Sequence, residues 1–210
     1  MNILVIGAGN MGSAFVKQLV IAGHQVSITA RNLEKVQAVA AAHPGAKAVA
    51  PTNAAALAEV IVLATGYGDA VNALKSVGDL HGKIVLDVTN PLTADYMGLT
   101  IGHSTSAAEE IAKAVPGTTV VKAFNTVFAQ ILAEGANFGN GHVVPAYFAG
   151  DDVTAKATVS ALIESTGFKA VDAGPLKNAR YLEAVAGLNI YFGYGAGKGT
   201  SIAPFWIERT

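Results

Sequence analysis

The feature that most constrains the fold is a glycine motif between a short apolar run and a stretch with helical spacing. Residues 2–6 read Asn-Ile-Leu-Val-Ile, a run typical of a buried strand. Gly7–Gly12 follows as a complete G-x-G-x-x-G, and apolar residues then recur at helical spacing over 13–22. Between a strand and a helix this motif predicts a βαβ unit that binds a dinucleotide. The alternative is a glycine-rich turn that binds no nucleotide.

Each glycine of the motif meets a separate physical requirement. Gly7 permits the tight turn out of the strand, Gly9 lets the backbone approach a pyrophosphate, and Gly12 lets the helix pack closely against the strand. The free N–H groups at the start of the helix then face the phosphates. We therefore expect the motif to bind the phosphates of the nucleotide.

The end of the second predicted strand, residues 25–29, indicates which dinucleotide is bound. NAD-binding folds place an Asp or Glu there, about 20 residues after the glycines, to bind the ribose 2′-hydroxyl. This chain has Ala30 and Arg31 instead, with Lys35 one helical turn further on. Because a guanidinium can pair with a 2′-phosphate, the pattern predicts NADP(H) rather than NAD(H). The alternative is that Arg31 and Lys35 are solvated charges at the start of a helix.

The composition of the chain limits the classes of binding partner that we expect. Of the 210 residues 51% are hydrophobic and 14% charged, which indicates a well-buried core and an additional apolar surface between subunits. The net charge of -1 gives no sign of a nucleic-acid or membrane partner. With no cysteine, five scattered histidines and an N-terminal stretch that reads as a strand, we expect no metal site, no signal peptide and a cytoplasmic protein.

Strand and helix patterns alternate along the chain. They predict an α/β fold over 1–210: a Rossmann-type doubly wound, mostly parallel sheet with a C-terminal helix, in a single domain with a small extension from about 176–210. The further strands are expected at 46–50, 60–64, 83–87, 119–123, 143–149 and 170–172, and the later helices at 69–77, 105–114, 152–165 and 176–192. Ligands of such sheets bind outside the carboxyl ends of the strands, which brings Gly7–Gly12, 65–68, 90–91 and 125–129 around one crevice.

Two later segments give the chain a family resemblance. Residues 172–180 read Asp-Ala-Gly-Pro-Leu-Lys-Asn-Ala-Arg, and 106–109 read Ser-Ala-Ala-Glu. Together with the glycine motif and Ala30-Arg31, they resemble the NADPH-dependent reductases of the deazaflavin coenzyme F420, and the NADPH domain of membrane metalloreductases is also similar. The resemblance covers almost the whole chain. It implies direct hydride transfer between the nicotinamide and a deazaflavin ring.

The resemblance also implies roles for single residues. The pyrophosphate would be held by Ala8, Gly9, Asn10 and Met11, and the 2′-phosphate by Ala30, Arg31 and Lys35. Thr65 and Asn90 would line the ribose and nicotinamide side, and Val127 and Ala129 would flank the nicotinamide. The family often has Ser in place of Ala30, and its archaeal members have His-Thr-Ile-Pro at 125–128 and Pro-Trp at 66–67. The cofactor side therefore matches the family better than the acceptor side.

Hydride transfer between flat rings requires stacking and exclusion of water more than acid–base chemistry. We accordingly predict no catalytic side chain and assign the small-molecule acceptor, a deazaflavin or a flavin such as FMN or FAD, to a pocket of Tyr67, Asn125, Thr126 and Phe128. Core packing of the aromatic residues and a simple turn at 125–126 are the alternatives.

The end of the chain is the last informative region. The predicted helix 176–192 is apolar on most sides, so it is either sandwiched within the fold or packs on a second subunit, and we expect a homodimer. The glycine-rich residues 193–200 are expected either to close over the acceptor or to cross loosely to the terminus.

Two other functions remain open. An NADPH-dependent reductase of a small carbonyl or imine would have a similar first half but needs a large helical domain with a catalytic lysine. A non-catalytic NADP-binding sensor would bind the nucleotide without turnover.

Overall fold

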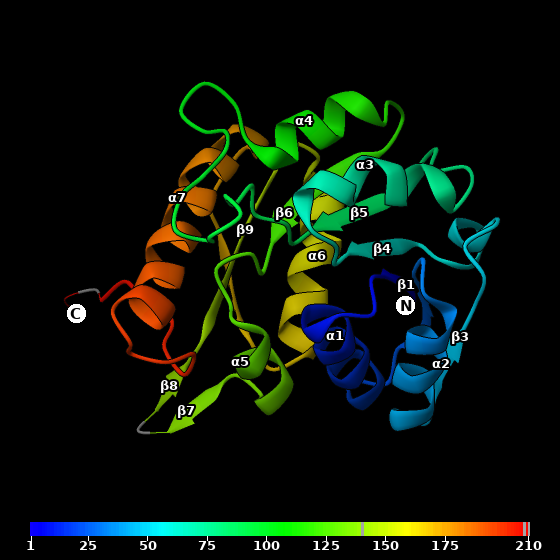
Figure 1. Cartoon of the computed structure of the whole chain (residues 1–210), viewed down its shortest axis with the longest axis horizontal. Helices are drawn as coiled ribbons and strands as arrows, with labels where there is room; N and C mark the ends of the chain where they lie inside the picture. Colours follow the sequence, from blue (N-terminus) through cyan, green and yellow to red (C-terminus); the bar gives the residue numbers. More distant parts are fainter. Residues whose placement is uncertain (140, 208, 210) are drawn as a thin grey trace.

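The protein folds around one eight-stranded sheet with helices on both faces (Figure 1). The computed structural model describes residues 1–139, 141–207 and 209. The strand order is β10-β9-β6-β5-β4-β1-β2-β3, and every neighbouring pair is parallel except β6 and β9. The predicted Rossmann-type, mostly parallel α/β fold is therefore confirmed.

The strands of this sheet are short and mostly buried. Their bounds are β1 (Asn2–Ile6), β2 (Gln25–Thr29), β3 (Ala46–Ala48), β4 (Val60–Leu63), β5 (Ile84–Asp87), β6 (Thr119–Ala123), β9 (Pro145–Gly150) and β10 (Lys169–Asp172). All four residues of β4 are buried, as expected for a continuous apolar run in the centre of a parallel sheet. A separate small hairpin consists of β7 (Asn137–Gly139) and β8 (His142–Val143).

The helices form the two outer layers. Their bounds are α1 (Asn10–Ile21), α2 (Leu33–Ala42), α3 (Tyr67–Ser76), α4 (Ala107–Ala114), α5 (Ala129–Glu134), α6 (Val153–Ser165) and α7 (Ala179–Ile190). Side chains of α1, α2, α5 and α6 share one core cluster with the sheet, and those of α3 and α4 share another on the opposite face. Figure 1 shows α7 beside α4 at one end of the molecule.

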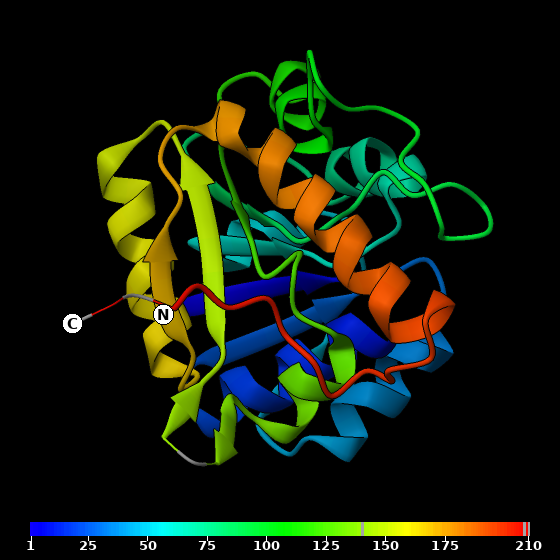
Figure 2. The same cartoon turned by 90° about the vertical axis from the view of Figure 1, so that its left-hand side faces the viewer.

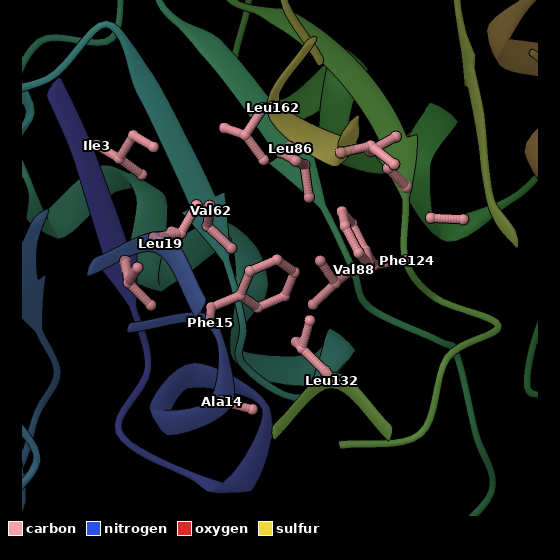
Figure 3. Packing of buried hydrophobic residues seen from close by; sticks show 14 of the residues in the cluster. Ile3, Ala14, Phe15, Leu19, Val62, Leu86, Val88, Phe124, Leu132 and Leu162 are labelled. Atoms are coloured by element: carbon pink, nitrogen blue, oxygen red, sulfur yellow. The ribbon is translucent and has the colours of Figure 1, made fainter. Parts of the chain in front are cut away.

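The larger core cluster supports the first strand and helix of the sheet, β1 and α1. Phe15 of α1 packs edge-on against Phe124 (Figure 3), and Phe124 packs in the same way against Phe168. Phe124 is fully buried and has φ +59°, a left-handed conformation that costs a bulky residue energy. The buried ring fixes this turn, which sets the direction of the residues that follow it.

Several predicted boundaries need correction. The helix expected at 105–114 begins at Ala107, because Ser106 is its N-cap: the Ser106 hydroxyl accepts from the Glu109 N–H and donates to the Glu109 carboxylate. The strand expected at 143–149 is divided at Val144 into β8 and β9, and β9 runs antiparallel to β6.

The closing helix differs from the expected 176–192 as well. It starts as a 3-10 turn (Leu176–Asn178), continues as α7 and ends in a π-helical turn (Tyr191–Gly195). Beyond it the chain passes α5 and crosses β9 (Figure 2), where Tyr147 packs edge-on against Trp206. Within the described residues no helix is long and apolar enough to cross a membrane.

Candidate functional site

The glycine motif has the geometry that its sequence predicts. A Cβ at Gly7 would lie 2.3 Å from the Ala64 carbonyl oxygen, and one at Gly12 would lie 1.9 Å from the Gly7 carbonyl oxygen. Neither position can hold a side chain without moving backbone. A Cβ at Gly9 would meet nothing within 4 Å, so the backbone there faces open space. The helix that begins at Asn10 has no side-chain cap and no acidic residue in its first turn, which leaves its N–H groups available to an anion.

A cavity of about 630 Å³ opens beside this motif. It lies over the ends of β1, β2 and β4, where a doubly wound sheet binds its ligand. The cavity brings together most of the residues predicted for the phosphates, the 2′-phosphate and the ribose: Gly7, Ala8, Gly9, Ala30, Arg31, Lys35 and Thr65.

The positive charge in this cavity has a partner that the sequence interpretation missed. Nη2 of Arg31 lies 2.8 Å from Oδ2 of Asp69, in the first turn of α3. The two side chains are 87% and 49% exposed, so water screens the pair and its net stabilisation is small. A 2′-phosphate would compete with Asp69 for the guanidinium. No local signal in the sequence pairs two residues 38 positions apart.

A second, smaller pocket of about 160 Å³ lies at the carboxyl ends of β5 and β6. We call it the acceptor-end pocket because it contains residues predicted to bind the acceptor. It collects Met11 from the glycine motif, Asn90, and Asn125–Ala129. Ala186, Asn189 and Ile190 of α7 form another wall, to which Tyr96 and Tyr194 contribute. The sequence predicted the strand-end residues but missed the wall from α7, because the apolar pattern of that helix pointed equally to a subunit interface.

Paired amides hold the centre of the acceptor-end pocket. Nδ2 of Asn90 donates to the Asn125 carbonyl oxygen at 2.8 Å, and Nδ2 of Asn125 donates to Oδ1 of Asn90 at 2.9 Å and to the Leu182 carbonyl oxygen at 3.0 Å. Oδ1 of Asn125 and Oγ1 of Thr126 are buried without a hydrogen-bond partner among the described residues. A buried polar atom without a partner is costly, and both of these atoms belong to residues that line this pocket.

Three predicted residues, Gly12, Asn10 and Tyr67, line neither of these two pockets. Asn10 lines a third cavity of about 520 Å³ between α1 and α5, which shares Phe128, Ala129 and Tyr194 with the acceptor-end pocket. Tyr67 lines none of these three cavities and instead packs at the start of α3 against the core. Burial, followed by the negative charges of Glu110, Glu183 and Asp87, raises the pKa of the Tyr67 hydroxyl.

Beneath the acceptor-end pocket is a buried ion network that the sequence did not reveal. Nζ of Lys122 lies 2.8 Å from Oδ2 of Asp87 and 2.8 Å from Oε1 of Glu183, and all three side chains are at most 2% exposed. Burial lowers the pKa of Lys122, but the two carboxylates outweigh this effect and raise its pKa above the ordinary value. Lys122 is therefore a buried ammonium.

The fold and these cavities define a class, a dinucleotide-binding α/β protein with a second pocket beside the glycine motif. Comparison with known proteins makes this specific. Residues 2–91 match the family model described as NADP oxidoreductase, coenzyme F420-dependent. The F420-dependent NADP reductase of Methanothermobacter marburgensis is 32% identical over 208 residues, which covers 90% of this chain and 91% of that protein. The chain belongs to this family of NADP oxidoreductases.

Other relatives agree with this assignment. The rat metalloreductase STEAP3 is 32% identical over 182 residues, but this chain spans only 35% of its length. A solved structure from Arthrobacter sp. FB24, provisionally assigned as an F420-dependent NADP reductase, superposes over 100% of both chains with a TM-score of 0.87 at 29% identity. Family membership confirms the predicted resemblance and supports NADP(H) as the nucleotide.

The likeness to imine-reducing enzymes concerns the fold. The reductive aminase of Aspergillus terreus, solved with NADPH and ethyl-5-oxohexanoate, matches with a TM-score of 0.67 at 18% identity. The match covers 93% of this chain and 62% of the aminase.

Proposed function

We propose that this protein transfers hydride between NADP(H) and a flat ring acceptor, a deazaflavin of the F420 type or a flavin. The observation that carries the proposal is the chemistry of the acceptor-end pocket. Its lining contains amides, a threonine hydroxyl, apolar side chains and two tyrosines, with no lysine, histidine or carboxylate. Such a lining can orient a ring and exclude water, and hydride transfer between stacked rings needs little more.

Different residues of the nucleotide site bind different parts of the cofactor. Ala8, Gly9, Asn10 and Met11 bind the pyrophosphate through backbone N–H groups at the start of α1. Arg31 and Lys35 pair with the 2′-phosphate beside Ala30, and Thr65 lies on the ribose side. The bound nucleotide supplies the hydride at its nicotinamide ring.

The residues proposed to bind the acceptor line the acceptor-end pocket. Val127 and Ala129 flank the nicotinamide, with Asn90 beside them. Oδ1 of Asn125 and Oγ1 of Thr126 supply the unpaired polar atoms for ring substituents. Phe128 and Tyr194 also line the pocket, where their rings pack edge-on with centroids 5.8 Å apart.

Reduction of a small carbonyl or imine is the second candidate. The hydroxyls of Tyr96 and Tyr194 are the observation in its favour, because a carbonyl oxygen needs a proton donor as it accepts hydride. A non-catalytic NADP sensor would bind the nucleotide but reduce neither class of acceptor.

The test of the function is an acceptor panel. NADPH oxidation is followed with deazaflavin, FMN, FAD, ferric chelates, aldehydes and cyclic imines, with NADH in parallel. We expect turnover with the deazaflavin or a flavin and a strong preference for NADPH. Turnover confined to carbonyls or imines favours the second candidate, and nucleotide binding without turnover favours the sensor.

We further propose a homodimer formed through α7 and the segment after it. Tyr181 and Leu188 on α7 and Tyr191 after it are 70%, 55% and 50% exposed, a large amount of apolar surface for one helix in water. Sedimentation equilibrium should give twice the mass of the chain, and Leu188→Glu should return it to the monomer. A monomeric wild-type protein contradicts this arrangement.

The segment 193–200 is proposed as a cover over the acceptor. Tyr194 lines two of the cavities, and the Thr200 hydroxyl donates to Gln130 of α5 across the entrance of the larger one. Truncation before Gly195 should raise the KM for the acceptor and leave NADPH affinity unchanged. Unchanged turnover after truncation contradicts the covering role.

A further inference from the structure

We propose that the buried ion network of Lys122, Asp87 and Glu183 positions Asn125 in the acceptor-end pocket. Lys122 and Glu183 are then positioning residues for hydride transfer, although neither lines the pocket. The inference rests on the proposed function for its kinetic consequences, while its structural consequence can be measured without any acceptor.

The first observation is that the Lys122 ammonium is fully paired. Besides the two carboxylates, its third contact is the carbonyl oxygen of Thr89, at 2.7 Å. An ammonium has three N–H donors, so all of them have acceptors. The network thereby joins three separate segments: the end of β5, β6 and α7.

The second observation is that each of these segments also carries either Asn125 or one of its hydrogen-bond partners. Asn90, whose amide exchanges hydrogen bonds with Asn125, follows Thr89. Leu182, whose carbonyl oxygen accepts from Nδ2 of Asn125, precedes Glu183. Asn125 itself follows β6 by way of the left-handed Phe124. A shift of any segment relative to the ammonium would therefore move a partner of Asn125.

The third observation concerns the excess charge. Two carboxylates and one ammonium leave one buried negative charge, which must be compensated. The start of α4 compensates it: the Ala107 N–H donates to Oε2 of Glu183 at 2.9 Å and the Ala108 N–H donates to Oε1 at 3.3 Å. The Thr89 N–H donates to Oδ1 of Asp87 at 2.9 Å. The network is thus complete only with α4, α7 and both strands in place.

The alternative is an ion network that serves stability alone. Buried ion pairs are often no more stabilising than apolar side chains of the same volume, so stability by itself gives a weak reason for this arrangement. The molecule also contains an internal control. Arg180 of α7 pairs with Glu109 of α4 at 2.6 and 2.8 Å, and this pair joins the same two helices without touching Lys122 or Asn125.

The experiment compares Glu183→Gln with Glu109→Gln in the full chain. Oε1 of Glu183 accepts from Lys122 and Ala108 and Oε2 accepts from Ala107, so the amide of Gln, which has one acceptor atom and an NH₂ group, leaves one of these sets of donors without its acceptor. We expect Glu183→Gln to lower kcat with the acceptor about tenfold or more at unchanged NADPH affinity, because small displacements of a positioning group have large rate effects. Glu109→Gln should change kcat less than about twofold. Equal losses in the two variants overturn the proposal.

A double-mutant cycle separates action through Asn125 from a general loss of structure. In the Asn125→Ala background, Glu183→Gln should cause little further loss of kcat, because the group that it positions is gone. The same tenfold loss in both backgrounds overturns the proposal.

Amide hydrogen exchange gives a readout that needs no acceptor. The Val127 N–H donates to the Phe124 carbonyl oxygen at 3.0 Å within the turn that carries Asn125. Its protection should fall about tenfold in Glu183→Gln and stay unchanged in Glu109→Gln, since local opening reports local stability. Unchanged protection in both variants overturns the positioning role even if the acceptor panel succeeds, and a failed panel leaves this result interpretable.

A milder variant serves if Glu183→Gln does not fold. Ala107→Pro removes one N–H from the Glu183 carboxylate at the first position of α4, where proline is well tolerated. It should reproduce the reduced protection of Val127 and the lower kcat to a smaller degree. Wild-type protection and wild-type kcat in this variant overturn the proposal.

Discussion

The nucleotide end and the acceptor end of the site are built in different ways. The nucleotide cavity is lined by short segments from the first 76 residues, and its charged side chains, Arg31, Lys35 and Asp69, are exposed or half-exposed. The acceptor-end pocket joins residues that are far apart in the sequence, and its central amides are buried and hydrogen-bonded to one another. Changes at the first end should therefore act mainly on affinity, and changes at the second mainly on turnover.

The largest expected effect is at the glycine motif. In Gly12→Ala the new Cβ would overlap the Gly7 carbonyl oxygen, so α1 must move from β1. We expect a loss of stability of about 1–3 kcal/mol or more and a loss of NADPH binding. Thermal unfolding and nucleotide titration measure both.

Gly9→Ala is the matched control. Its Cβ meets no protein atom within 4 Å, so the melting temperature should be close to that of the wild type while NADPH binding weakens. A similar loss of stability in both variants would contradict the division of roles between the two glycines.

The next effect is at the acceptor end. Asn125→Ala removes the side chain that bridges Asn90 and the Leu182 carbonyl oxygen. We expect kcat to fall about 10–100-fold with NADPH affinity nearly unchanged, because the change misplaces the acceptor and leaves the phosphate contacts intact. A rise in the Kd for NADPH at constant kcat would show that this residue belongs to the nucleotide end.

Arg31→Ala tests the nucleotide end alone. A charge-assisted contact contributes about 1.5–3 kcal/mol, so NADPH affinity should fall about ten- to a hundredfold with NADH affinity nearly unchanged. Asp69→Asn is the companion variant and should raise NADPH affinity by a factor of a few, since it frees an exposed guanidinium from a weak ion pair. Equal losses for the two nucleotides in Arg31→Ala would contradict the assignment of the 2′-phosphate.

The smallest expected effect is a pH dependence of the stability through Glu109, which lies in neither the nucleotide cavity nor the acceptor-end pocket. Hydrogen bonds from Arg180 hold the pKa of Glu109 below its ordinary value of 4.5. Burial alone would raise this pKa, and a hydrogen bond from Ser106 helps to lower it. Its contribution to stability is present above that value and is lost as the pH falls through the lower, folded-state pKa. The difference in melting temperature between the wild type and Glu109→Gln should therefore shrink below pH 4.5. A constant difference down to about pH 3 would contradict the lowered pKa.

The contrast between the two ends also explains what the sequence could predict. Gly7–Gly12 and Arg31 are local signals, since their meaning depends on neighbours a few residues away, and the strand-end positions of Asn90 and Asn125 follow from the parallel sheet. The pairing of Lys122 with Asp87 and Glu183 depends on tertiary contacts between segments far apart in the sequence, and each residue alone resembles an ordinary charge in a strand or helix. Tyr67 illustrates the converse, because a strand-end aromatic residue turned out to pack against the core.

The central claim is direct hydride transfer from NADPH to a flat ring acceptor. It is tested by a single-turnover reaction of the protein with NADPH that carries deuterium at the transferred position of the nicotinamide and with oxidised deazaflavin. Our account predicts that the deuterium is recovered on carbon in the reduced deazaflavin and that Asn125→Ala slows this transfer without weakening NADPH binding. A deazaflavin that stays oxidised while a ketone or cyclic imine takes up the deuterium would contradict it.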